Sequence, residues 1–125
     1  MLVSNRVLAL YLNRPCTYKP LNGEAYDTHI AYEQFFDQNY AGAVINPHLR
    51  KFDTITEEEA LILYGMEHPG VEFMAYYVYG SAVDWAVMSF GDTSYVTPDQ
   101  LLYLTHIGID MFNLIEQGLA KEVDK

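Results

Sequence analysis

The chain has 125 residues; half are hydrophobic, 17 are acidic and seven are basic, so its net charge is −10. This length and composition predict one folded domain over residues 1–125 and exclude a disordered chain. Seven bases can neutralise few phosphates, which disfavours direct nucleic-acid binding, and no apolar run reaches the ~18 residues of a membrane span.

The first elements are read from apolar runs and turn residues. Residues 6–12 are apolar and end near a proline, which favours a strand, with a short helix capped by Ser4 as the alternative. Two prolines, an asparagine and a glycine predict a loop over residues 13–23. The N-terminal stretch is too mixed for a secretion signal.

A helix is expected next, from residue 27 or 28 to Tyr40. As in an amphipathic helix, polar residues lie opposite a face that carries Tyr32, Phe35, Phe36 and Tyr40. Residues 43–46 are expected to form a short strand that ends before Pro47.

A second helix is expected over residues 57–66. Thr56 can cap it, and Glu59, three residues on, completes a capping box. The glutamates at positions 57–59 also lie at the positive end of the helix dipole, which is a local structural reason for three consecutive acids.

The strongest β signal lies in residues 71–90. Residues 71–79 and 82–90 are rich in aromatic and β-branched side chains, and Gly80-Ser81 separates them, so the pattern predicts a hairpin with a tight turn. Both faces of this hairpin would be rather apolar, which predicts that it is sandwiched or that it presents one face to a partner.

The last helix is expected over residues 98–117. Thr97 can cap it, Pro98 fits its first position, Gln100 closes a capping box, and Gly118 is a stop signal. Apart from a narrow polar stripe the helix is apolar, so it is either the central core helix or also contacts a second subunit.

These elements predict an α+β fold. The expected architecture is a small antiparallel sheet with the 71–90 hairpin at its centre. About three helices pack on it, near residues 28–40, 57–66 and 98–117.

Motifs that carry chemistry are scarce. The sequence has no glycine-rich phosphate loop and no paired-cysteine metal spacing. His106 and Asp110, four residues apart, could form half of a metal site with His68 or Glu67, but such spacing is common on a solvated helix stripe. We therefore expect no metal and no cofactor.

Cys16 and Asp84 are weaker candidates for chemistry. A single cysteine excludes an internal disulfide, which fits a reducing compartment and a cytoplasmic protein, and Cys16 has no local activating signature. If Asp84 were buried beside Trp85, its charge would need a partner. That partner would come from the N-terminal part, because residues 52–120 contain no lysine or arginine.

This cation-free window, residues 52–120, is the most informative feature of the chain. It holds eleven acids, whereas residues 1–51 carry five bases and four acids. A negative surface attracts basic partners and repels nucleic acid.

The leading hypothesis is therefore a non-enzymatic binding protein that docks on a basic, nucleic-acid-handling surface of a partner such as a nuclease. Small acidic inhibitors made by phages and mobile elements against host defence systems have this general profile. The expected contact residues are Glu57, Glu58, Glu59, Glu67, Tyr76, Tyr79, Asp92, Asp99 and Asp110.

Two alternatives come from other classes of protein. A small enzyme or ligand-binding domain would hold a pocket between the sheet and the last helix, with His106, Asp110 and Asp84 as its polar groups. A structural subunit would form a homodimer through the apolar C-terminal helix.

Overall fold

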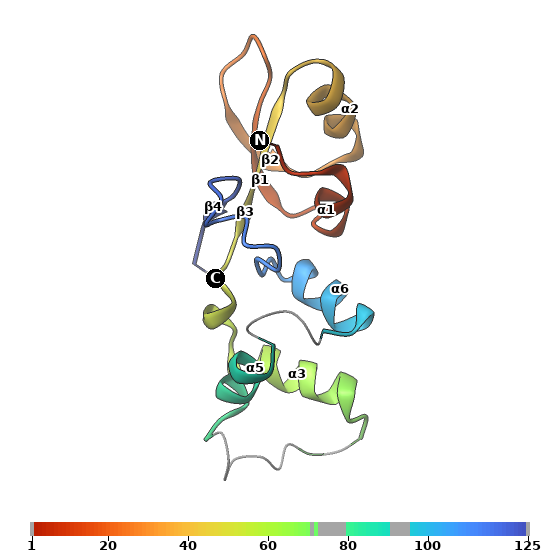
Figure 1. The fold of residues 1–125 in the computed structure, drawn as a ribbon, viewed down its shortest axis with the longest axis vertical. Coiled ribbons are helices and arrows are strands. Elements are labelled where there is room, and N and C mark those ends of the chain that lie inside the picture. The colour runs from red at the N-terminus through yellow and green to blue at the C-terminus, as the bar shows by residue number, and fades with distance from the viewer. Residues whose placement is uncertain (1, 71, 73–79, 91–95, 125) are drawn as a thin grey trace.

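A small sheet and several short helices form the chain (Figure 1). The computed structural model describes residues 2–70, 72, 80–90 and 96–124. Within these ranges it contains four strands and five α-helices, so the α+β class is confirmed. The elements are α1 (Asn5–Leu10), β1 (Pro15–Lys19), β2 (Tyr26–His29), α2 (Tyr32–Tyr40), β3 (Val44–Leu49), the 3-10 helix η1 (Phe52–Thr54), α3 (Glu57–Glu67), α5 (Ala82–Phe90), α6 (Pro98–His106) and β4 (Lys121–Glu122). No helix in these ranges is long and apolar enough to cross a membrane.

The sheet is mixed, whereas an antiparallel sheet was expected. Its strand order is β2-β1-β3-β4; β1 is antiparallel to β2 and β3, and β3 is parallel to β4. Side chains alternate across the strands, so Cys16, Tyr18, Ile45 and Leu49 share one face and are buried. Helices α1 and α2 lie on the side of this face (Figure 1).

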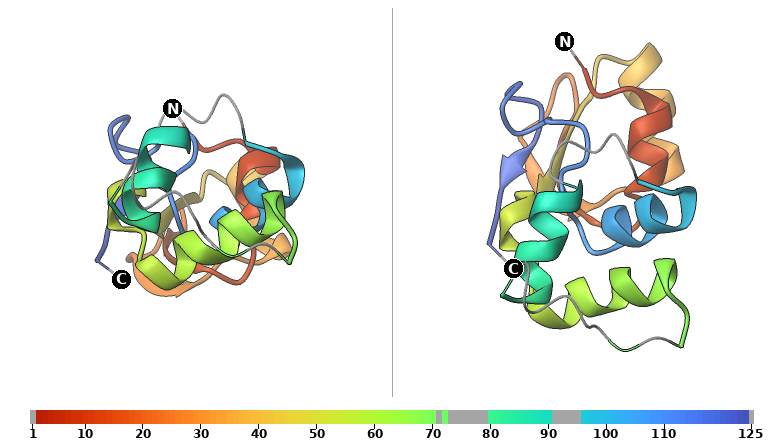
Figure 2. Two further views of the ribbon diagram at one scale, coloured as in Figure 1. Left: turned by 90° about the horizontal axis from the view of Figure 1, so that it is seen from below. Right: turned by 60° about the horizontal axis from the view of Figure 1, so that its bottom comes forward.

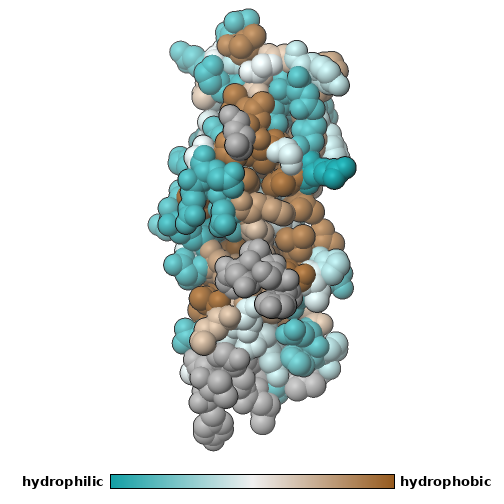
Figure 3. Space-filling model, in the orientation of Figure 1, coloured by the Kyte–Doolittle hydropathy of each residue, from teal (hydrophilic) through white to brown (hydrophobic). Residues whose placement is uncertain are grey.

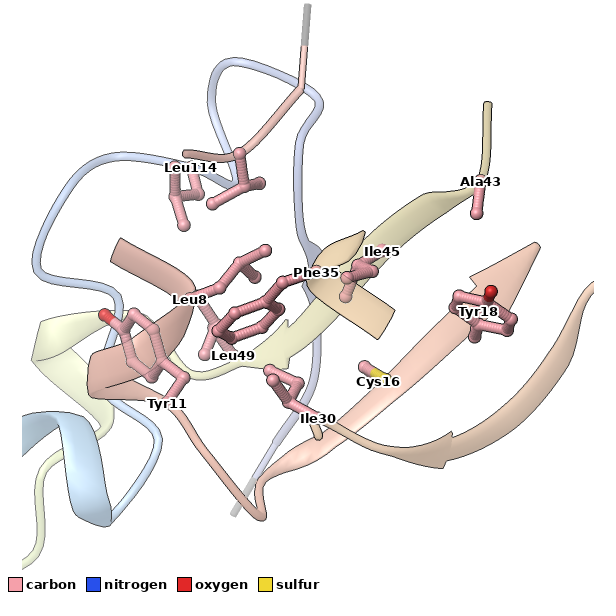
Figure 4. Close-up of a cluster of buried hydrophobic side chains, with 11 residues drawn as sticks. Leu8, Tyr11, Cys16, Tyr18, Ile30, Phe35, Ala43, Ile45, Leu49 and Leu114 are labelled. Carbon is pink, nitrogen blue, oxygen red and sulfur yellow. The ribbon is translucent and has the colours of Figure 1, made fainter. Parts of the chain in front are cut away.

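Two clusters of buried side chains form the core. The first joins the sheet to α1 and α2, and Figure 4 shows how its members converge; they include Leu8, Ile30, Phe35, Ile45 and Leu49. The second lies among α3, α5 and α6 and includes Leu63, Trp85, Ala86, Phe90 and Leu104. Phe112 packs against both clusters. We call α1, α2 and the sheet the sheet end, and α3, α5 and α6 the helical end (Figures 1 and 2).

The first elements differ from the expected ones. Residues 5–10 are helical, so the strand over 6–12 is wrong and the alternative of a helix capped by Ser4 is confirmed. The hydroxyl of Ser4 accepts a hydrogen bond from the Val7 amide at 3.3 Å. The expected loop contains β1, whose proline is its first residue, a position where strands tolerate a missing N–H.

The next two elements have shifted boundaries. Residues 26–29 form β2, so the helix begins only at Tyr32, and three of the four aromatic residues on its expected apolar face are exposed: Tyr32, Phe36 and Tyr40. Strand β3 continues through Pro47 to Leu49. The proline fits because β4 pairs only with His48 and Leu49, so that side of β3 has no partner strand at Pro47 among the described strands.

The expected central hairpin is wrong in its second half. Residues 82–90 form helix α5, and residues 71 and 73–79 of the expected first strand lie outside the described residues. The apolar run also fits a helical period, because Ala82, Trp85, Ala86 and Phe90 lie at helical spacing and are all buried against neighbouring helices. The hydroxyl of Ser81 caps the helix by accepting from the Asp84 amide at 3.1 Å.

The last helix is shorter than expected, because α6 ends at His106 and not near residue 117. Gly108 adopts a φ of 85°, which suits glycine and turns the chain away from the helix axis. The following residues pack as irregular chain. The Tyr11 hydroxyl donates to the Ile109 carbonyl at 2.7 Å and accepts from the Met111 amide at 3.1 Å. Buried backbone groups thus find partners outside a helix.

The predicted starts of α3 and α6 are confirmed. Thr56 and Glu59 form a reciprocal capping box, with the Thr56 hydroxyl accepting from the Glu59 amide at 3.2 Å and the Glu59 carboxylate from the Thr56 amide at 2.9 Å. Thr97 and Gln100 form the same arrangement at α6. Local hydrogen bonding therefore determines both positions.

Arg50 connects the two ends of the molecule. Its guanidinium donates to both carboxylate oxygens of Glu59, at 2.9 and 2.8 Å, and to the carbonyls of Thr54 and Ile107. Its backbone N–H and C=O bond to the Gly108 carbonyl and the Asp110 amide, each at 2.8 Å. Arg50 is 3% exposed, so the end of β3, η1, α3 and the end of α6 all meet at one buried cation.

Replacement of Glu59 with Gln tests this connection. The hydrogen bonds from Arg50 are the main cause that lowers the pKa of Glu59 from 4.5 to about 2, while burial opposes them. A carboxylate with a lowered folded pKa stabilises the fold above pH ~4.5 and loses that effect as the pH falls toward ~2. We expect Glu59→Gln to cost about 3 kcal/mol at neutral pH and to flatten the acid-dependent loss of stability, measured by urea unfolding.

Glu58→Gln is the matched control, because Glu58 is the exposed neighbour of Glu59 in the same helical turn. Its effect is expected to stay within about 0.5 kcal/mol. Equal losses in the two variants would show that the buried ion pair does not have the stated role.

Candidate partner-binding site

The nine expected contact residues divide by their position in the fold. Tyr76, Tyr79 and Asp92 lie outside the described residues. The rest belong to the helical end or to the segment after it: Glu57, Glu58, Glu59 and Glu67 on α3, Asp99 on α6, and Asp110 beyond its end.

Three of these acids form contacts within the fold. Glu59 is buried against Arg50. The carboxylate of Glu57 accepts hydrogen bonds from the amides of Ala82 and Val83, at 3.0 and 3.1 Å, and so satisfies free N–H groups at the start of α5. A carboxylate there also stabilises the positive end of the helix dipole.

Asp110 has a similar structural role after α6. Its carboxylate accepts three backbone N–H groups, from Phe112 at 3.3 Å, Leu114 at 2.9 Å and Ile115 at 3.0 Å. These bonds hold the irregular segment that places Leu114 in the core beside α1. Asp110 therefore organises the chain more than it presents charge to solvent.

Glu58, Glu67 and Asp99 remain as exposed acids on α3 and α6. Of the described residues, no lysine or arginine forms an ion pair with any of the three; Glu67 has the His68 imidazole at 3.8 Å. Helices α3, α5 and α6 contain no lysine or arginine at all. These carboxylates therefore keep their charge available for an external cation.

An apolar groove of about 610 Å³ lies beside these acids, and we call it the α1–α6 groove. Leu10 and Leu12 line it from the α1 side, Leu102 and Tyr103 from α6, and Met66 from the end of α3. Leu102 is 56% exposed and Met66 38%. Asp99 also lines the groove, so an apolar floor and an unpaired carboxylate occur together.

The surface of this part of the molecule agrees with that description. Figure 3 shows hydrophobic side chains gathered over the middle of the displayed face, around the level at which α1 and α6 adjoin, with more hydrophilic surface beside them. Sequence reasoning missed the groove because it favoured a strand for residues 6–12 and placed the apolar side chains of the last helix in a core or a dimer. The exposed position of Leu102 arises because α6 is covered on only part of its circumference.

The residues expected for an enzyme-like site do not come together in the described structure. Asp84 is exposed on α5, so its charge needs no buried partner. His106 ends α6 and lines the α1–α6 groove, whereas Asp110 lines a different pocket of about 290 Å³ beside Lys51. Within the described ranges, no group of three or more His, Cys, Asp or Glu side chains could hold a metal ion.

A polar cluster on the outer face of the sheet is also poorly arranged for nucleophilic catalysis. The Thr17 hydroxyl donates to Asp27 at 2.9 Å, so it accepts from the Nε2–H of His48 at 2.7 Å. A nucleophile would instead donate its proton to the imidazole. Cys16 is fully buried, and burial raises the pKa of its thiol to about 11, which keeps it protonated.

Replacement of Asp110 with Ala tests the structural role of that acid. Three backbone N–H groups would lose a charged acceptor, so we expect a loss of about 2 kcal/mol in the free energy of unfolding, measured with urea. Glu116→Ala, at an exposed acid in the same segment, is the control and should change stability by less than about 0.5 kcal/mol. No change in the free energy of unfolding of Asp110→Ala would show that this carboxylate has no structural role.

The site is interpreted from its own residues. Comparison of the chain with protein-family models, with curated proteins and with solved structures finds no match.

Proposed function

We propose that the protein is a non-enzymatic binding protein whose helical end, together with α1, docks on a basic surface of another protein. The partner surface is one that handles nucleic acid, as in a nuclease, so that the bound protein acts as an inhibitor. Phage and mobile-element anti-defence proteins work in this general way, and we propose the same role here.

One observation supports this proposal most directly. An apolar groove lies between α1 and α6, and unpaired exposed carboxylates beside it, those of Glu67 and Asp99 foremost, lie on α3 and α6, which contain no lysine or arginine. Protein interfaces commonly combine an apolar centre with a polar rim, and charge complementarity raises the rate of association. The lysines and arginines of the chain lie elsewhere, on α1, around β1, after β3 and in the C-terminal segment.

The groove indicates the chemistry of the bound element. Its floor of leucine, methionine and tyrosine side chains would accept an apolar side chain of the partner. Lysine or arginine residues beside that side chain would meet Asp99, Glu67 and Glu58. This assignment shifts the expected contacts away from Glu57 and Glu59, which form hydrogen bonds within the fold.

Direct nucleic-acid binding is not part of the proposal, since the exposed charge of the helical end would repel phosphates. We also propose a cytoplasmic location. The single cysteine cannot form an internal disulfide, which fits a reducing compartment, and the proposed partner, a nucleic-acid-handling protein, works inside the cell.

Two alternatives keep weaker support. A homodimer through the C-terminal helix would have to use the same α1–α6 groove, because Ile109, Met111 and Leu114 are buried in the core beyond the end of α6. A small-ligand pocket between the sheet and α6 would need His106, Asp110 and Asp84 together, and the described structure places these three side chains apart. Light scattering and a thermal-shift screen with nucleotides and metals test them respectively.

The docking surface is tested with the double variant Glu67→Lys/Asp99→Lys. Wild-type and variant proteins are immobilised, and host lysate is applied at low salt. We expect the wild type to capture a basic protein that a DNA duplex and a salt gradient both displace. We expect the variant to bind that protein at least tenfold more weakly in a titration of the purified pair, because it places cations against a basic surface.

Glu24→Lys/Glu33→Lys is the matched control. It changes the net charge equally at exposed acids of the sheet end, and Glu33 lies beside the exposed aromatic residues of α2. In a titration at about 0.15 M salt, the affinity of this control should stay within about threefold of wild type, because charges farther away than a Debye length are largely screened. Equal losses in both variants, or a captured protein that DNA does not displace, would contradict the proposal.

A further inference from the structure

Helix α6 has two opposite faces, and the fold covers only one of them. On the covered face, Gln100, Leu104 and Thr105 are buried. The other face lines the α1–α6 groove and consists of Asp99, Leu102, Tyr103 and His106. These four positions have the spacing i, i+3, i+4 and i+7, which is typical of a helix face that packs on a neighbouring helix.

The groove has the length of two helical turns. His106 follows Asp99 by seven residues along α6, which corresponds to about 10.5 Å at the rise of an α-helix. A second helix would present side chains at i, i+4 and i+7 over the same distance. A cavity of ~150 Å³ accepts one benzene-sized group, so a groove of about 610 Å³ has room for three such side chains. Ala9 on the opposite wall is small, which lets a helix backbone approach α1.

The walls of the groove suit a helix better than an extended segment. The described lining residues belong to α1, α6, the end of α3 and the turn that contains Leu12, so no strand edge is among them. An extended segment would bring unpaired N–H and C=O groups against apolar side chains, which costs free energy. A helix satisfies its backbone groups internally and presents side chains alone.

The negative charge lies at one end of the groove. The C-terminal end of α3 and the start of α6 lie on the same side of the molecule (Figures 1 and 2). Glu67 and Asp99 are therefore at that end, whereas His106 is at the other. Lysine or arginine residues at the acidic end would be attracted, and a carboxylate there would be repelled.

We propose that the α1–α6 groove binds an amphipathic α-helix of the partner protein. Apolar side chains of this helix, at i, i+4 and i+7, contact the groove floor, and its lysine or arginine residues contact Asp99 and Glu67. The inference rests on the proposed function, which makes the groove part of the docking surface, and adds that the bound element is helical.

The test measures peptide binding to the whole purified protein by NMR of methyl groups. The probe is an alanine-rich peptide of about 16 residues, which is helical in water, with leucines at i, i+4 and i+7 and lysines beside the first leucine. We expect it to shift the methyl resonances of Leu10, Met66 and Leu102, with a dissociation constant on the order of 0.1 mM at low salt.

Three control peptides separate the parts of the proposal. In one, the leucines are spread around the helix; in another, glutamates replace the lysines; in the third, a central proline breaks the helix and leaves the leucines in place. Each should bind at least about tenfold more weakly than the probe. No binding of the probe, or equal binding of any control peptide, would overturn the proposal.

Leu102→Gln should weaken binding of the probe at least about fivefold, because it removes an exposed apolar side chain from the groove. Leu61→Gln is the matched control, since Leu61 is 40% exposed on α3 and is not a lining residue; it should bind the probe like the wild type. Equal losses in the two variants would contradict binding at the groove.

The peptide measurement and the capture of a partner fail independently. Capture of a basic protein that DNA displaces, together with no binding of the helical probe, would leave the proposed function standing and overturn the helical element. Binding of the probe at the groove, together with no captured basic protein, would overturn the proposed function and show that the groove nevertheless accepts a basic helix.

Discussion

The bidentate ion pair between Arg50 and Glu59 is the interaction on which the rest of the structure depends. It joins the last residues of the sheet to the first turn of α3, and the backbone of Arg50 holds the turn that follows α6. Arg50 is the last arginine before the cation-free window of residues 52–120, and its side chain is buried against residues of that window. A buried charge whose partner is removed is strongly destabilising, so the arrangement fixes how the two ends meet.

The same pairing leaves the other acids of the helical end without cations. Glu57 and Asp110 are used by the backbone, as acceptors for the N–H groups of α5 and of the segment after α6. Glu58, Glu67 and Asp99 have no such role, and they lie on the two helices that carry Met66 and Leu102 at the groove. Structural acids and free acids cannot be told apart by charge alone; their hydrogen bonds distinguish them, and this separation supports docking through one surface.

Local signals in the sequence predicted local structure well, as the capping boxes at Thr56 and Thr97 show, because both partners lie within one helical turn. Long-range contacts were not predictable. The apolar run 82–90 fits both a strand and a helix pattern. The helix is stabilised by burial against α3 and by the Glu57 carboxylate, which accepts hydrogen bonds at the start of α5. The end of α6 depends on Arg50, which lies 57 residues before Ile107. The α1–α6 groove has no sequence signature, because separate segments of the chain form it.

We propose that the helical end together with α1, and not α2 or the sheet, meets the partner. Hydrogen–deuterium exchange of the purified complex tests it directly, because amide protection reports which segments become covered. We expect added protection in α1, α6 and the C-terminal half of α3, with β1 and β2 unchanged. Protection confined to β1, β2 and α2, with α3 and α6 exchanging as in the free protein, would contradict it.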